Sequence, residues 1–184
     1  MARWRLHGLL AGVLEALPGL ALPGAAPTGT TQASSVGAAR AGWQWPLEPT
    51  PAVVRRFQPS PTPWGAGHRG VDLLARAGQP VLAAGPGVVS FSGLLAGRGV
   101  LAVTHAGGLR TTYEPVRARA AAGTVVRAGQ QVAVVDVTPG HCPPAVCLHW
   151  GLLRGAGPAA TYLDPLSLLG VDLAPPVLLP LAAP

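Results

Sequence analysis

The sequence predicts an all-β domain built on an antiparallel sheet, and three observations support this fold class. Between residues 80 and 137 short runs rich in valine, leucine, threonine and aromatic residues follow one another, a composition typical of strands. Glycines separate these runs, where tight hairpin turns require a positive φ angle. No stretch of useful length shows helical periodicity before residue 160. Consecutive short strands joined by tight turns favour antiparallel pairing.

The expected strands are Pro80–Ala84, Val88–Phe91, Val100–Thr104, Leu109–Tyr113, Thr124–Val126 and Gln131–Val137. The segment 58–67, which precedes them, contains three prolines and two glycines and is expected to be a loop. After the strands, Asp164 fits an N-cap, Pro165 a first helical residue and Gly170 a stop signal. The sequence therefore predicts one short closing helix near the C-terminus.

The organisation of the chain follows from shifts in composition. Residues 1–26 combine two early arginines, a short apolar stretch and small residues suited to cleavage, which predicts a signal peptide. Residues 27–42 are rich in Ala, Gly, Ser and Thr and are expected to form a flexible linker. We expect the folded domain at 43–170 and an apolar, proline-rich tail at 171–184. The mature protein is then expected to be secreted or associated with the cell wall or periplasm.

Composition excludes several classes of protein. Charged residues make up 11% of the chain and hydrophobic residues 49%, a balance that disfavours disorder over most of its length. No run of about 20 apolar residues exists, so a membrane span in the mature form is not expected. All 13 basic residues are arginine, they are scattered, and aromatic residues make up only 5%. A stacking surface for nucleic acid interleaves the two types, so nucleic acid is not an expected partner.

Two segments carry candidate ligands for a metal ion. His68 and Asp72 lie among glycines that argue against a helix, so they are expected to flank a turn or bulge entering a strand. Side chains alternate along a strand, which places Cys147, His149 and Gly151 on one face, away from the core. Each signal alone is weak, because a lone histidine at the end of a strand is more often structural than a ligand. His105, which ends a strand before a glycine turn, is expected to be structural or to line a groove.

Taken together and in this order, the segments resemble a known family. His68-x-x-x-Asp72 is similar to the His-x-x-x-Asp motif of the lysostaphin/LytM-type zinc metallopeptidases, and His149 matches the second histidine of their His-x-His motif. The segments 70–89, 107–113 and 123–134 also resemble glycine-punctuated strands of that family. The resemblance covers residues 44–170 and implies the family's β-sheet domain, which cuts peptidoglycan peptides.

The resemblance implies a zinc ion (Zn2+) held by His68, Asp72 and His149. Three protein ligands leave the fourth position to water, which is the arrangement of catalytic zinc. Such an ion lowers the pKa of its water and polarises the scissile carbonyl. The implied partner is peptidoglycan, and the implied reaction is hydrolysis of a peptide bond.

The sequence departs from the family at two positions. Members carry two further histidines near the metal, and here Pro115 and Cys147 occupy those positions. Only four residues separate Cys142 from Cys147, and we expect a disulfide between them in an exported protein. His141 and Glu114 are candidate catalytic replacements for the missing histidines, although His141 is also compatible with a solvated loop. Arg110 is a candidate for lining the substrate groove and is also compatible with a solvated surface.

These observations leave two functions open. The chain is either an exported zinc endopeptidase acting on peptidoglycan, with full or weak activity, or a catalytically silent zinc-binding module that binds the wall or regulates other wall hydrolases. A carbohydrate-binding β-domain without metal is disfavoured, because it gives no reason for His68, Asp72 and His149 to occur at the family's positions.

Overall fold

The computed structural model describes residues 42–62, 65–137 and 142–170. The predicted signal peptide, all but the last residue of the predicted linker, the predicted tail and His141 lie outside these residues. Across the described ranges, no helix has the length and apolar character needed to cross a bilayer.

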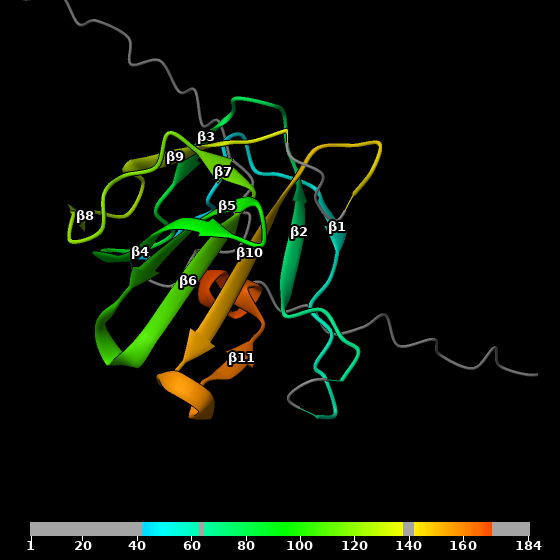
Figure 1. The fold of residues 1–184 in the computed structure, drawn as a ribbon, viewed down its shortest axis with the longest axis vertical. Helices are drawn as coiled ribbons and strands as arrows, with labels where there is room; N and C mark the ends of the chain where they lie inside the picture. The colour runs from blue at the N-terminus through cyan, green and yellow to red at the C-terminus, as the bar shows by residue number, and fades with distance from the viewer. Residues whose placement is uncertain (1–41, 63–64, 138–141, 171–184) are drawn as a thin grey trace, which may run out of the picture. The chain divides into compact units, whose positions relative to one another are not determined.

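An antiparallel sheet of eight strands dominates the domain, as the all-β prediction required. Its strands are β1 (Val53–Arg55), β2 (Gly70–Leu74), β4 (Gly87–Leu95), β5 (Arg98–Thr104), β6 (Leu109–Glu114), β8 (Val125–Val126), β10 (Cys147–Arg154) and β11 (Thr161–Leu163). They are arranged in the order β1-β2-β10-β6-β5-β4-β8, with β11 paired to β10 (Figure 1). The late strand β10 therefore lies in the middle, between the early strand β2 and β6.

A second, smaller antiparallel sheet has the order β3-β9-β7. It consists of β3 (Pro80–Leu82), β7 (Val116–Arg117) and β9 (Gln131–Val135). All six predicted strands are present, with ends shifted by a few residues. The short strands β1, β7 and β11 were not predicted, because two or three residues carry too little periodicity to be recognised.

The predicted closing helix is present as a single 3₁₀ segment, η3 (Pro165–Leu169). The Asp164 carboxylate accepts a hydrogen bond from the Leu166 backbone N–H at 2.9 Å, and Gly170 ends the helix with φ of 65°. The described residues also contain two further single turns, η1 (Ala106–Gly108) and η2 (Gly157–Ala159). Both are glycine-containing connections between strands, which the sequence presents as turns.

The core lies on one face of the large sheet. Alternate residues of β10 and β2 point into it, including Leu148, Trp150, Val71 and Leu73, all fully buried. Apolar residues of the small sheet and of η3 complete the same cluster. The intervening residues of β2, β6 and β10 occupy the opposite face, and these include the candidate ligands.

A buried chain of hydrogen bonds ties β6 to the loop before β4. The Ala84 N–H donates to the Tyr113 hydroxyl at 3.0 Å, Tyr113 and Thr111 share a bond of 2.8 Å, and Thr111 contacts His105 Nε2 at 2.8 Å. His105 Nδ1 donates to the carbonyl of Pro86 at 2.8 Å. Every partner is satisfied when the proton of a neutral His105 is on Nδ1. His105 is thus structural, and burial raises the pKa of Tyr113 to about 12.

This chain of bonds predicts acid sensitivity of the fold. Burial lowers the pKa of His105 below its ordinary 6.5, against the opposing effect of the Pro86 carbonyl. The unfolded chain therefore binds a proton more readily, so this part of the stability is present above pH 6.5 and is lost as the pH falls below it. Thermal unfolding of wild-type protein and of His105→Gln, both with chelator present, measures this effect. As the pH is lowered, the stability of the wild type should decrease more than that of His105→Gln. Equal losses in the two proteins would contradict the assignment.

Candidate metal centre

Two neighbouring strands bring the candidate ligands together. Asp72 on β2 is paired in register with His149 on β10, so their side chains emerge side by side on the same face. His68 precedes β2 and is held by an isolated bridge to Gln58. Antiparallel pairing thus joins residues that are 77 positions apart in the chain.

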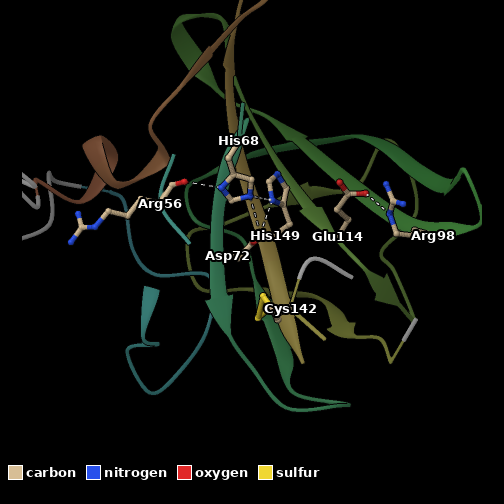
Figure 2. Close-up of polar contacts among 8 residues, drawn as sticks. Arg56, His68, Asp72, Arg98, Glu114, Cys142 and His149 are labelled. Atoms are coloured by element: carbon tan, nitrogen blue, oxygen red, sulfur yellow. Dashed lines mark hydrogen bonds and ion pairs between the residues drawn. A yellow bond between two sulfur atoms is a disulfide. The ribbon is translucent and has the colours of Figure 1, made fainter. Parts of the chain in front are cut away.

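The three side chains converge on one point (Figure 2). His149 Nδ1 lies 2.8 Å from Asp72 Oδ1. His68 Nε2 lies 3.1 Å from Asp72 Oδ1 and 3.1 Å from His149 Nδ1. All three residues are buried, with exposed fractions of 3% for His68, 0% for Asp72 and 9% for His149.

The tautomer of His68 is fixed by the backbone. Its Nδ1 lies 2.8 Å from the carbonyl oxygen of Arg56, an acceptor, so Nδ1 carries the proton and Nε2 presents a lone pair to the cluster. Burial is the main effect on the pKa of His68 and lowers it, which outweighs the raising effects of the Arg56 carbonyl and Asp72. The neutral imidazole, which is the form that binds metal, is therefore favoured.

This arrangement fits a zinc ion. In a tetrahedral site with bonds of about 2.0 Å, neighbouring ligand atoms lie about 3.3 Å apart. The observed separations of 2.8 to 3.1 Å are close to this value. Two imidazole nitrogens and one carboxylate oxygen form a donor set that zinc prefers.

The absence of a side chain at Gly70 leaves room for the His149 ring. A Cβ on Gly70 would lie 2.7 Å from His149 Nε2 and would collide with the carbonyl oxygen of Trp150. A Cβ on Gly151 would instead meet the hydroxyl of Thr112, a side chain that can rotate away. The two glycines are paired across β2 and β10 and are therefore a matched pair for substitution.

We expect Gly70→Ala to displace the His149 ring and weaken metal binding at least tenfold. The added methyl group should also cost about 1–3 kcal/mol of stability, the usual range for overpacking. Gly151→Ala should have a much smaller effect on both quantities. Zinc titration and thermal unfolding of the two variants would measure this, and equal zinc affinities would contradict the role given to Gly70.

Glu114 lies beside the ligands on the same face of the sheet. It is paired in register with His149 across β6 and β10, opposite in direction to the buried Tyr113. Its Oε2 accepts a hydrogen bond from Arg98 Nε at 3.3 Å (Figure 2). The pairing of β6 with β10 therefore places this candidate base next to a candidate metal ligand, His149.

The remaining candidates are distributed around the cluster. The structure contains the Cys142–Cys147 disulfide, so Cys147 has no thiolate to offer a metal (Figure 2). Pro115 is buried at the end of β6. Arg110 is half-buried on the face that carries Glu114, four residues along β6. His141 lies outside the described residues.

Two contributors to the site were not predicted from the sequence. The carbonyl of Arg56 orients His68, and Arg98 contacts Glu114. A backbone carbonyl leaves no sequence signal, because every residue has one. Arg98 had a weak signal, since it directly follows Gly97 and lies two residues before the predicted strand Val100–Thr104.

Comparison with known proteins tests the family resemblance seen in the sequence. The model of peptidase family M23 matches residues 66–165, more than half of the chain. Uncharacterized protein Rv2891 of Mycobacterium tuberculosis is 51% identical over 125 residues, covering 68% of this chain and 50% of that protein. The chain thus spans about half the length of these mycobacterial relatives.

Solved structures share the fold. The antimicrobial peptidase lysostaphin from Staphylococcus simulans superposes with a TM-score of 0.59 at 24% identity, over 78% of this chain and 61% of that one. A zinc containing peptidase from Vibrio cholerae has a TM-score of 0.53 at 25% identity, over 63% of this chain and 37% of that one. With the family match over most of the domain, the chain belongs to peptidase family M23.

Proposed function

We propose that the chain is an exported zinc metallopeptidase that hydrolyses peptide bonds of peptidoglycan. The observation that carries this proposal is the convergence of His68 Nε2, Asp72 Oδ1 and His149 Nδ1 within 3.1 Å of one another in a member of a peptidase family. Three ligands on one side leave an open position, as catalytic zinc sites do.

When bound there, zinc supplies Lewis-acid polarisation of the scissile carbonyl and a more acidic water. The chain's own groups do the rest. His68, Asp72 and His149 fix the ion's position, and Glu114 takes the proton from the attacking water and returns it to the leaving amine. The water oxygen bonds to the carbonyl carbon as the carbon–nitrogen bond breaks, which yields one carboxylate and one amine. General acid–base help of this kind contributes about 10²–10⁴ in rate.

Glu114 is suited to this task by place and orientation. It emerges opposite His149, and Arg98 holds its carboxylate through Oε2. The contact to one oxygen leaves Oε1 as a hydrogen-bond acceptor for water. His141, which directly precedes Cys142 in the sequence, is a second candidate for the same role.

A silent zinc-binding module that binds the wall or regulates other wall hydrolases is the competing proposal. Pro115 has no side-chain donor or acceptor, and the disulfide removes Cys147 as an acid or base. If neither Glu114 nor His141 replaces the missing histidines, the ligands hold zinc without turnover.

The proposal of export rests on two features. Residues 1–26 have the pattern of a signal peptide, followed by the linker 27–42 before the domain at 43–170 and the tail 171–184. The Cys142–Cys147 disulfide suits an oxidising compartment such as the periplasm or the cell wall.

Release of soluble fragments from purified peptidoglycan separates the two functions. Zinc-loaded protein should release fragments, chelator should stop the release, and added zinc should restore it. Asp72→Asn, which keeps the size of the side chain but removes a ligand charge, is the matched control and should be inactive. Bound zinc without any release would establish the silent module instead.

A further inference from the structure

We propose that Arg98 binds a substrate carboxylate, so that this peptidase selects peptides with a free carboxylate within about two residues of the scissile bond. The inference rests on the proposed function and specifies its substrate class. The observation behind it is the Arg98 guanidinium group, which is anchored beside the candidate metal ligands and whose two terminal nitrogens make no hydrogen bond to any described residue.

The anchor engages only one nitrogen of Arg98. Its Nε donates to Glu114 Oε2 at 3.3 Å, and the side chain is 35% exposed. Within the described residues, neither terminal nitrogen of this guanidinium makes a hydrogen bond. These two nitrogens carry four N–H donors in a planar fork, which matches the two oxygens of a carboxylate.

The backbone of Arg98 is held firmly. It begins β5 directly after the turn at Ala96 and Gly97, and it is paired in register with Leu95. The next residue, Gly99, packs so closely against the Val116 carbonyl and the Arg119 guanidinium that a Cβ would collide with both. A fixed backbone and an anchored Nε reduce the entropy lost when the fork binds a ligand.

Its position defines which carboxylate it reaches. Glu114 is directly opposite His149, a pairing that places Cα atoms about 4.5–5.5 Å apart. The Arg98 guanidinium is hydrogen-bonded to the Glu114 carboxylate and therefore lies one side chain further from His149 than Glu114 does. An extended peptide advances about 3.5 Å per residue, so a peptide whose scissile bond lies at the ligand cluster places its first or second neighbouring residue at Arg98.

A second arginine on the same face of the sheet provides a control for Arg98. Glu114 offsets one positive charge of the region but occupies only the Nε side of Arg98. Arg110 is on the same face without a hydrogen bond to any described residue, but it lies four residues further along β6 from the position opposite His149. Arg110→Gln is therefore a control that removes an arginine of the same face outside this reach.

The test uses Nα,Nε-diacetyl-L-Lys-D-Ala-D-Ala and the same peptide as its C-terminal amide, which differ only in the carboxylate beside the scissile bond. Dissociation constants are measured by calorimetry on the full chain with chelator present, so no hydrolysis occurs. We expect the acid to bind at least tenfold more tightly, the usual range for a charge-assisted pair of hydrogen bonds. Arg98→Gln should abolish the preference, Arg98→Lys should retain part of it, and Arg110→Gln should keep it.

Kinetics with zinc-loaded protein provides the second measurement. Wild-type protein should prefer the acid through a lower KM. Arg98→Gln should raise KM for the acid but not for the amide, and any change in kcat should be the same for both peptides. Equal binding of acid and amide by wild type, or an undiminished preference in Arg98→Gln, would overturn the inference. If neither peptide nor peptidoglycan is hydrolysed, the proposed function is wrong. The ratio of the dissociation constants of acid and amide, measured with chelator, would still test the role of Arg98.

Discussion

Replacement of His149 by alanine is expected to reduce zinc affinity at least a hundredfold. Wild-type protein should carry about one zinc ion per chain, because three ligand atoms already converge within 3.1 Å. Loss of even an outer-shell partner of a zinc ligand costs 10- to 100-fold in affinity, and loss of the ligand itself should cost more. Competition with a chromophoric chelator would measure both affinities.

The matched control is His105→Ala. His105 is equally buried but bonds to Pro86 and Thr111, away from the ligands, so its loss should reduce stability and leave the stoichiometry of the folded protein at one. Undiminished zinc affinity in His149→Ala would show that the ion is held elsewhere. A finding that wild-type protein purified without chelator contains no zinc would also contradict the proposed zinc site.

Replacement of Glu114 by glutamine should lower kcat by about 10²–10⁴, the contribution of a general base. Glutamine keeps the shape and can still accept from Arg98, but it cannot take a proton from water at neutral pH. Zinc stoichiometry should be unchanged, because Glu114 is not among the three converging ligands. Steady-state hydrolysis of peptidoglycan peptides and metal analysis of the same samples would measure both.

His141→Ala identifies the alternative base. If Glu114 acts alone, this variant should keep most of the wild-type kcat. A large loss in His141→Ala combined with full activity in Glu114→Gln would transfer the role to His141. Full activity in both variants would mean that neither residue replaces the missing histidines.

The antiparallel fold and the orientation of His149 followed from local patterns. Alternation along residues 147–152 indicated that His149 faces away from the core, and in the structure Leu148 and Trp150 fill the core while His149 is on the opposite face. Strand pairing, which no single segment encodes, then showed that Glu114 is opposite His149.

Features that depend on long-range contacts were missed. The hydrogen bond from His68 to the Arg56 carbonyl spans 12 residues and uses a group that every residue possesses. The contact between Arg98 and Glu114 depends on how β5 is paired with β6. Single-turn 3₁₀ helices such as η1 and η2 are too short for a periodic pattern, so their glycines indicated only turns.

The most direct test of the proposed peptidase is digestion of peptidoglycan in ¹⁸O-labelled water, followed by mass spectrometry of the fragments. Hydrolysis of a peptide bond adds one water, so we expect one heavy oxygen in each new carboxylate, one new amine, and loss of both products when chelator is present. Intact peptides after digestion with protein that demonstrably holds zinc would contradict the account.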